Sequence, residues 1–193
     1  MTQSPIFPRP EFLWQLGTPE TKYENPWMRV EEIPAIDPNG QDTSYGLIHF
    51  KNIAVGVVPY QDGYIWLVGQ SRVSSRSYTW EIPAGGDPSR DNPLGTAHRE
   101  LREETGFTAG RMDQILKMEL SNSITDEICL VYVATDLTAG EAELESSEDI
   151  SLMKISLDDA LKAVEAGEIR HALGIATIFK LDRMRAAGEL DGR

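Results

Sequence analysis

The chain has 193 residues, of which 31 are Asp or Glu and 18 are Lys or Arg, so its formal net charge is −13. A chain of this length can bury one sizeable core, and so acidic a surface disfavours nucleic acid as a partner. The single cysteine, Cys129, excludes a disulfide within the chain, and no apolar stretch approaches the roughly 18 residues of a membrane span. With no charged-then-apolar leader at the N-terminus, we expect a cytoplasmic protein without a membrane partner.

The N-terminal residues are predicted to form an arm followed by a hairpin. Residues 1–20 are rich in proline and lack periodicity, so we expect them to lie over a surface. The segment MRVEEIPAI (28–36) alternates as a strand does, and a strong turn follows at residues 37–40. Residues 45–50 are the expected partner strand.

Strands continue beyond residue 52. NIAVGVVP (52–59) is apolar and β-branched, and a turn separates it from YIWLVGQ (64–70), so both indicate buried strands. Further strands are expected at residues 80–85, 115–120, 128–134 and 151–155.

Two helices are predicted near the C-terminus. Ser156 is followed by an acid at the third helical position, which is close to a capping box, and an amphipathic pattern continues to Gly167. Residues 172–187 form a second helix with a broad apolar side. Strands on both sides of a central helix, then a strand and two helices, indicate an α/β fold with a mixed sheet.

The central helix is predicted within GGDPSRDNPLGTAHRELREETGF (85–107). Asn92 is a good N-cap, Pro93 suits the first helical position, and Gly106 can adopt the left-handed conformation that ends many helices. The helix should therefore cover residues 93–105. Its core-facing positions are expected to be Leu94, Ala97 and Leu101.

Three acids of this helix gather on another face. Glu100, Glu103 and Glu104 are three and four residues apart, with Arg99 and Arg102 between them. Acids are unfavourable near a helix C-terminus, which carries partial negative charge. The pattern indicates either a solvated face with ordinary ion pairs or a site for hard divalent cations, which prefer carboxylate oxygens.

The whole stretch resembles the Nudix box, the signature of the Nudix hydrolases. The matching pattern is Gly85, an acid at Asp91, and the run RELREETGF at residues 99–107. The family has Glu where this chain has Asp91. The resemblance implies a Nudix α/β/α sandwich with a mixed central sheet over residues 45–187, a tail at 188–193, and an N-terminal β arm at 1–44 through which related enzymes dimerise.

The resemblance also implies the chemistry, which is attack of water on a diphosphate bridge. Glu100 and Glu104 are then the principal Mg²⁺ ligands, with Glu103 as a third ligand and the backbone carbonyl of Ala84 completing the set; Mn²⁺ is an alternative ion. Glu103 also counts among the catalytic residues, as does Arg99. Glu81 either adds an oxygen ligand or is an ordinary edge residue.

The resemblance to the ADP-ribose pyrophosphatase branch implies a general base in the acidic loop at residues 144–150. Glu148 and Glu145 are both candidates, and Glu148 is preferred because it stands next to the entry to the following strand. Arg72 matches a phosphate-contacting arginine of the ADP-ribose pyrophosphatase branch, and Arg76 lies in the same serine-rich loop. The alternative for both arginines is an ordinary solvated position.

Other residues are candidates for holding the base and the sugar. Tyr23, Trp27 and Tyr78 could stack on a base, although Trp27 is equally explained by packing. Glu127 either hydrogen-bonds sugar hydroxyls or caps the next strand. His49, His98 and His171 form no spaced cluster, so zinc is not expected.

The loop at residues 121–127 indicates the substrate class. Its form, SNSITDE without a proline, is similar to nucleotide-sugar hydrolases of the superfamily. We expect a nucleoside diphosphate linked to a sugar, with ADP-ribose second, and NMP and a sugar phosphate as products. The alternative is a regulator of the same fold that senses a nucleotide sugar without cleaving it, which only the departure at Asp91 favours.

Overall fold

The computed structural model describes residues 6–8, 10–143 and 149–192, which divide into two units. The N-terminal unit comprises residues 1–51 together with 123–126, and the second unit contains the rest. The division falls at Lys51, later than the expected boundary at residues 44 and 45. The reason is that the strand ending at Phe50 pairs along its whole length within the N-terminal sheet.

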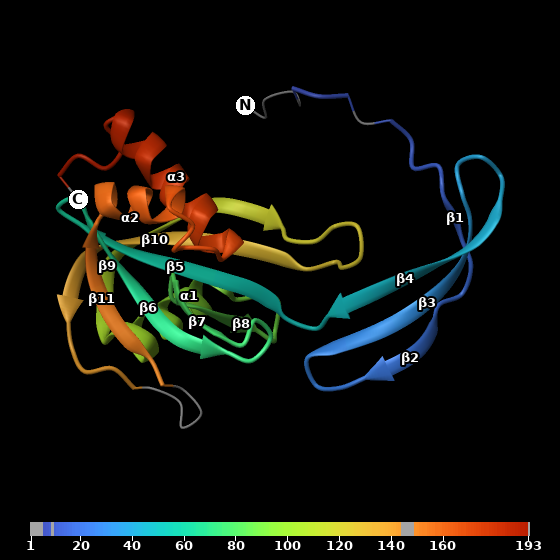
Figure 1. Ribbon diagram of the computed structural model, residues 1–193, viewed down its shortest axis with the longest axis horizontal. Coiled ribbons are helices and arrows are strands. Elements are labelled where there is room, and N and C mark those ends of the chain that lie inside the picture. The colour runs from blue at the N-terminus through green and yellow to red at the C-terminus, as the bar shows by residue number, and fades with distance from the viewer. Residues whose placement is uncertain (1–5, 9, 144–148, 193) are drawn as a thin grey trace. The chain divides into compact units, whose positions relative to one another are not determined.

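The N-terminal unit is a four-stranded antiparallel sheet with β3 (Met28–Ile36) at its centre (Figure 1). β4 (Asp42–Phe50) pairs with one edge of β3, as the predicted hairpin requires. β1 (Gln15–Leu16) and β2 (Glu20–Glu24) share its other edge. The sequence patterns predicted neither strand, because every side chain of these two edge strands is exposed and apolar alternation is therefore missing.

Residues 123–126 join this sheet at the free edge of β4. Thr125 forms a parallel bridge with Ile48, whose N–H donates to the carbonyl of Ile124 at 2.8 Å. The Asp126 carboxylate accepts a hydrogen bond from the Phe50 N–H at 2.9 Å and also contacts Nδ1 of His49. The middle of the loop expected to define the substrate class is thus bound to the N-terminal sheet.

The second unit contains a seven-stranded mixed sheet. Its main order is β11-β6-β5-β10-β9, with β7 paired to β6 and β8 paired to β5. β5 and β10 are parallel, and the other pairs are antiparallel. The strands are β5 (Ile53–Gln61), β6 (Tyr64–Arg72), β7 (Ser77–Glu81), β8 (Ala84–Asp87), β9 (Phe107–Glu119), β10 (Ile128–Ala139) and β11 (Ser151–Ser156).

Alternating residues of β10 serve two cores on opposite faces of this sheet. Val131 and Val133 belong to the larger core, which contains residues of the two C-terminal helices. Tyr132 and Ala134 belong to the smaller core, which contains residues of the central helix. Helices therefore cover both faces (Figure 1), and the predicted α/β/α sandwich with a mixed sheet is confirmed.

The central helix α1 (Pro93–Thr105) has the predicted bounds and caps. The Asn92 side chain accepts a hydrogen bond from the Gly95 N–H at 3.1 Å, and Gly106 has φ 74°. Ala97 and Leu101 are fully buried, whereas Leu94 is 45% exposed, so its predicted place in the core is wrong. Leu94 lies in the first turn, outside the contact that Ala97 and Leu101 make with the smaller core.

The C-terminal helices are α2 (Leu157–Glu165), capped by Ser156 as predicted, and α3 (Ala172–Ala186). Both contribute to the larger core. Leu190 is also buried in that core, so the segment expected to be a tail contains a packed residue. Among the described residues, no helix is long and apolar enough to cross a membrane.

Candidate active site

The acidic face of α1 packs against β8. Glu100 and Glu104 are 6% and 4% exposed. The Glu104 carboxylate accepts a hydrogen bond from the Ala84 N–H at 3.2 Å, and the Glu100 carboxylate lies so close to Gly85 that a Cβ there would overlap it. Glycine at position 85 is therefore required to admit Glu100, which gives the first position of the motif a steric reason.

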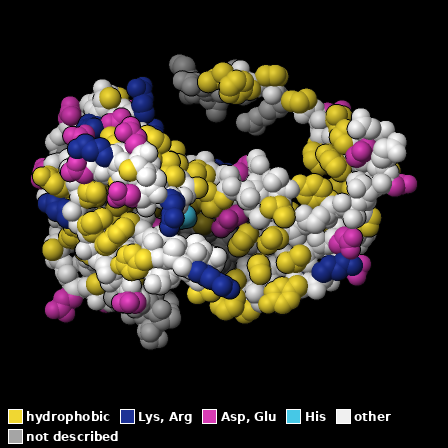
Figure 2. Space-filling view, in the orientation of Figure 1, with side chains coloured by type: hydrophobic (Ala, Val, Ile, Leu, Met, Phe, Trp, Pro, Cys, Tyr) yellow, Lys and Arg dark blue, Asp and Glu magenta, His cyan; other side chains and the backbone are white. Residues whose placement is uncertain are grey.

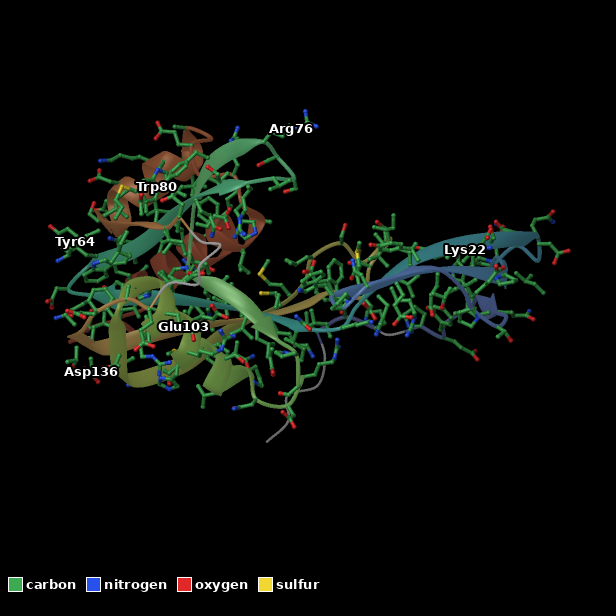
Figure 3. The ribbon with its side chains drawn as sticks, turned by 90° about the horizontal axis from the view of Figure 1, so that it is seen from below. Lys22, Tyr64, Arg76, Trp80, Glu103 and Asp136 are labelled. Atoms are coloured by element: carbon green, nitrogen blue, oxygen red, sulfur yellow. The ribbon has the colours of Figure 1, made fainter. Side chains whose placement is uncertain are left out.

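Arg99 links two of the acids. Its guanidinium donates to Glu100 at 2.5 Å, to Glu103 at 2.6 Å and to the Gly86 carbonyl at 3.3 Å. Burial lowers the pKa of Arg99, but the carboxylates of Glu100 and Glu103 raise it further, so the net shift is upward and the side chain stays charged. Figure 3 shows Glu103 on this helix.

These residues fit a hard divalent cation in chemistry and burial. Glu100, Glu103, Glu104 and the carbonyl of Ala84 are all oxygen donors, the ligand type that Mg²⁺ and Mn²⁺ accept. Two of the carboxylates are removed from water, which is costly unless positive charge compensates. Within the described residues, no three acid, His or Cys side chains already stand in a ligating arrangement. Arg99 supplies the compensating charge in this structure.

Asp87, which sequence reasoning missed, organises the loop before α1. It is 2% exposed and accepts hydrogen bonds from the Ser89 N–H and hydroxyl and from the Asn92 N–H, at 2.7 to 3.1 Å. Burial raises the pKa of Asp87, but these hydrogen bonds outweigh it and leave the pKa below its usual value. Asp91 is exposed, and among the described residues its carboxylate has no hydrogen-bond or ion-pair partner.

A second polar cluster lies on the hairpin of β6 and β7. Arg72 donates to Glu81 through Nε at 3.1 Å and Nη2 at 2.7 Å, and Thr79 donates to the same carboxylate at 2.6 Å. Glu81 is 3% exposed, so it is not an ordinary edge residue. Burial raises the pKa of Glu81, but the hydrogen bonds and charge of Arg72, with help from Thr79 and His171, lower it overall.

Two more candidates lie on the same hairpin. Arg76 is exposed at the turn, with φ 50°, and Figure 3 shows it at the end of the hairpin. Tyr78 is 47% exposed, packs across Gly69 and makes an edge-to-face contact with Trp80 at 5.7 Å. Tyr78 thus remains accessible to a stacking ligand.

The other predicted site residues fall elsewhere. Tyr23 and Trp27 belong to the N-terminal unit and are 53% and 65% exposed. Glu127 precedes β10, and its carbonyl accepts a hydrogen bond from the Leu120 N–H at 3.3 Å. Glu145 and Glu148 lie outside the described residues.

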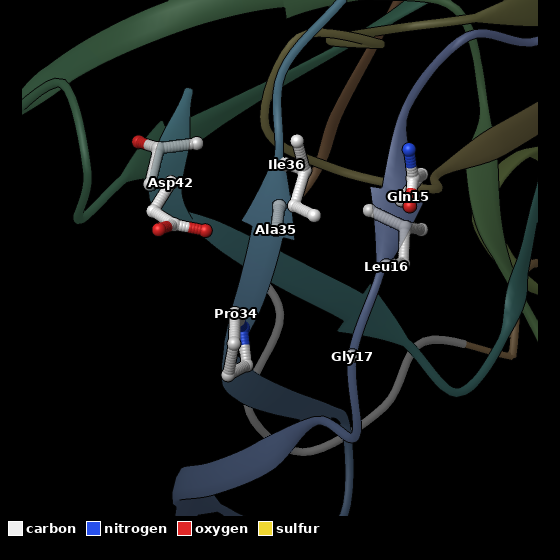
Figure 4. Close-up of a pocket in the computed structure, with 8 residues that line it drawn as sticks. Gln15, Leu16, Gly17, Pro34, Ala35, Ile36 and Asp42 are labelled. Atoms are coloured by element: carbon white, nitrogen blue, oxygen red, sulfur yellow. The ribbon is translucent and has the colours of Figure 1, made fainter. Parts of the chain in front are cut away.

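A pocket of about 400 Å³ lies in the N-terminal unit (Figure 4), and it contains none of the predicted site residues. Its walls come from β1, β3 and β4. No residue of α1 is among its lining residues. The lining residues are Gln15, Leu16, Gly17, Pro34, Ala35, Ile36, Asp42 and Thr43.

The fold and this site define a class of enzyme, in which an α/β/α sandwich presents buried helical carboxylates beside a glycine loop. The model of the NUDIX domain family matches residues 50–173, which is more than half of the chain. The chain therefore belongs to the Nudix family, and it is a Nudix pyrophosphohydrolase.

Several known proteins are similar to this chain. The ADP-ribose pyrophosphatase of Bacillus subtilis (strain 168) is 34% identical over 145 residues, covering 74% of this chain and 77% of that protein. The methanol dehydrogenase activator of Bacillus methanolicus is 31% identical over 161 residues, covering 82% and 86%. A crystal structure of an ADP compounds hydrolase has a TM-score of 0.83 at 21% identity, covering 95% and 100%, and supports the fold.

Proposed function

We propose that this protein hydrolyses the diphosphate bond of a nucleoside diphosphate linked to a sugar, either ADP-ribose or a nucleotide sugar, to give NMP and a sugar phosphate. The observation that carries the proposal is the burial of Glu100 and Glu104 against Ala84 and Gly85. Buried carboxylates need positive charge nearby, and a phosphate-bound cation provides it. Similarity to the ADP-ribose pyrophosphatase of B. subtilis favours ADP-ribose within this class.

Glu100, Glu103 and Glu104, with the carbonyl of Ala84, would hold a divalent cation, Mg²⁺ in the first place and Mn²⁺ as an alternative. Such an ion, when bound, stabilises charge on phosphate oxygens and activates water. Arg99 positions Glu100 and Glu103, because it already donates to both carboxylates. The protein's own part is to present these oxygens from a rigid helix against a fixed loop.

Substrate contacts follow from the second cluster. Arg72 is 40% exposed while its Nε edge is held by Glu81, so it offers a fixed cation to a phosphate oxygen. Arg76 adds charge from the same hairpin, and Tyr78 offers an accessible ring for a base. Tyr23, Trp27 and Glu127 stay in the proposal as further contacts to base or sugar.

The general base is proposed in the loop at residues 144–150. Glu148 is the first choice and Glu145 the second, on the resemblance to the ADP-ribose pyrophosphatase branch. The base takes a proton from the attacking water in the chemical step, so its loss should lower kcat with little effect on KM.

The N-terminal unit is proposed to form a homodimer. Figure 2 shows hydrophobic side chains on the surface of this unit. Large apolar side chains are costly to leave in water, and burial against a second copy would remove them from it. Those at least half exposed are Ile6, Phe7, Phe12, Leu13, Leu16, Tyr23 and Trp27.

Phosphatase-coupled phosphate release from a panel of ADP-ribose and nucleotide sugars tests the function, with Mg²⁺, with Mn²⁺ and with chelator. We expect release from at least one compound only with metal, and products separable as NMP and sugar phosphate. Absence of release from every compound with both metals would overturn the proposal. Binding without release would indicate the sensing alternative.

A further inference from the structure

We propose that Glu81 and His171 are positioning residues that hold Arg72 where it meets the diphosphate. The N-terminal end of α3 then takes part in the site through its N-cap residue, His171. This inference rests on the proposed function, because it assigns Arg72 a phosphate. Three elements contribute one side chain each: β6 supplies Arg72, β7 supplies Glu81, and the N-cap of α3 supplies His171.

The first step is the geometry of the arginine. Arg72 is directly opposite Ser77 in the β6–β7 register, whereas Glu81 is opposite Val68, so the arginine side chain reaches back along the hairpin. Two parallel hydrogen bonds, at 3.1 and 2.7 Å, hold one edge of its guanidinium. Arginine has many rotamers, and a paired edge of this kind restricts them before a ligand arrives.

The second step is that Glu81 itself cannot move freely. It is buried in β7, and the Thr79 hydroxyl donates to its Oε1 at 2.6 Å. Glu81 also lies three residues before Ala84, so their Cα atoms are at most about 11 Å apart. The carboxylate that orients Arg72 is therefore rigid and close to the segment that contacts the acids of α1.

The third step concerns His171. Its Nδ1 is buried and has no hydrogen-bond partner among the described residues, although it lies 3.4 Å from Glu81 Oε2. Buried polar atoms are nearly always paired, so an unpaired one calls for an explanation. We assign it the role of a second donor to Glu81: the Nδ1–H of His171 is directed at Oε2 and keeps the carboxylate oriented toward Arg72 when the guanidinium also meets a phosphate.

The position of His171 suits this role. His171 is the N-cap of α3, but its side chain makes no capping hydrogen bond, so the imidazole does not stabilise the helix end in this way. The preceding residue, Arg170, donates to the Ser77 hydroxyl on β7 at 3.3 Å. Two successive residues at the start of α3 therefore approach the same hairpin.

Two other roles for Glu81 are open to the same experiment. If Glu81 were a metal ligand, its replacement would raise the Mg²⁺ concentration needed for activity. If Glu81 were a packing residue, its replacement would lower the free energy of unfolding, and this effect would be independent of Arg72. A positioning residue instead acts only through the arginine, so its effect disappears once the arginine is gone.

The experiment is a double-mutant cycle on the full chain with the best substrate of the panel. Arg72→Gln and Glu81→Gln should each raise KM by about 10-fold or more, with kcat changed less and the Mg²⁺ requirement unchanged, since both remove ground-state binding. The double variant should be no worse than Arg72→Gln. Asp182→Asn is the control, because it also removes an acid from an arginine pair, at the other end of α3.

His171 is tested by a pair of substitutions. His171→Ala should raise KM several-fold, and His171→Asn should restore it, because an Asn amide can donate from nearly the same place as Nδ1. Equal activity of wild type and His171→Ala would remove His171 from the proposal.

A spectroscopic readout separates positioning from general stability. The Nε–H signal of Arg72, identified by its loss in Arg72→Gln, should be sharp in wild type and Asp182→Asn and absent from Glu81→Gln.

Additive effects of Arg72→Gln and Glu81→Gln, or an increased Mg²⁺ requirement, in an active wild type would overturn this inference alone. A wild type that is inactive on the whole panel would overturn the proposed function and the inference with it.

Discussion

The two units of this protein bury side chains to very different extents. In the described part of the N-terminal unit, Ile33 and Ala35 are the only buried hydrophobic residues, whereas the Nudix unit encloses its sheet between helices. The buried acids show the same contrast. Glu81, Asp87, Glu100 and Glu104 are the buried acids of the described chain, and all lie in residues 81–104 of the Nudix unit.

This difference in burial suits the sheets of the two units to different roles. Buried carboxylates need a rigid, dry setting with fixed hydrogen-bond donors, which only the layered unit provides. A single uncovered sheet cannot provide that setting, but its exposed apolar side chains suit association. We therefore assign the proposed chemistry to the Nudix unit and the proposed assembly to the N-terminal unit.

The largest expected effect is a loss of catalysis that does not involve the N-terminal sheet. Glu100→Gln or Glu104→Gln should lower kcat by at least about 10²-fold, because each removes a charged oxygen from a site that stabilises charge in the transition state. Thermal unfolding should remain at or above the wild-type temperature, since repulsion between acids falls. Glu165→Gln, an exposed acid on α2, should match wild type in both measurements. Wild-type turnover of either site variant at limiting Mg²⁺ would exclude that residue.

The next effect tests assembly by a matched substitution in each unit. Leu16→Glu on β1 should weaken the dimer about 10- to 100-fold, which corresponds to the burial of one leucine side chain. Leu152→Glu on β11 should leave the dimer intact, because that leucine is similarly exposed but lies in the Nudix unit. Analytical ultracentrifugation over a concentration series measures both, and equal weakening would contradict the assignment of assembly to the N-terminal sheet.

A smaller effect concerns the buried acid of the loop. Asp87→Ala should lower the free energy of unfolding by about 1–3 kcal/mol, because the N–H groups of Ser89 and Asn92 lose their acceptor. Urea titrations of wild type and variant measure the difference.

The difference in free energy of unfolding between wild type and Asp87→Ala should depend on pH. The pKa of Asp87 is below its ordinary value of 3.8, so its contribution is fully present above that value and is lost as pH falls through the lower folded pKa. The gap between wild type and Asp87→Ala should therefore close only in strong acid. A gap that is constant down to pH 2 would show that the carboxylate is not the source.

The smallest effect is expected four residues later. Asp91 is exposed and does not contact Arg99, so Asp91→Glu should change turnover by no more than a few-fold and the free energy of unfolding by no more than about 1 kcal/mol. An inactive wild type switched on by this substitution would instead favour the sensing alternative. Asp87 is buried and Asp91 is exposed, so this one loop shows the same contrast in side-chain burial as the two units.

The sequence by itself determined the features whose causes are local. The bounds of α1 followed from Asn92, Pro93 and Gly106, and the clustering of its acids followed from helical spacing, because caps and i, i+4 neighbours involve only adjacent turns. The strand patterns were sufficient for β3 and for the order of helices and strands that predicts an α/β fold with a mixed sheet.

Only the tertiary structure decided which distant residues meet. Nothing in the sequence pairs Arg72 with Glu81 or places His171 beside them, because those contacts depend on strand register and on where α3 begins. The same holds for residues 123–126, which join β4 through backbone hydrogen bonds that any side chains permit. Burial likewise distinguished Asp87 from Asp91, since the order of residues along a loop does not say which carboxylate turns inward to meet the N–H groups.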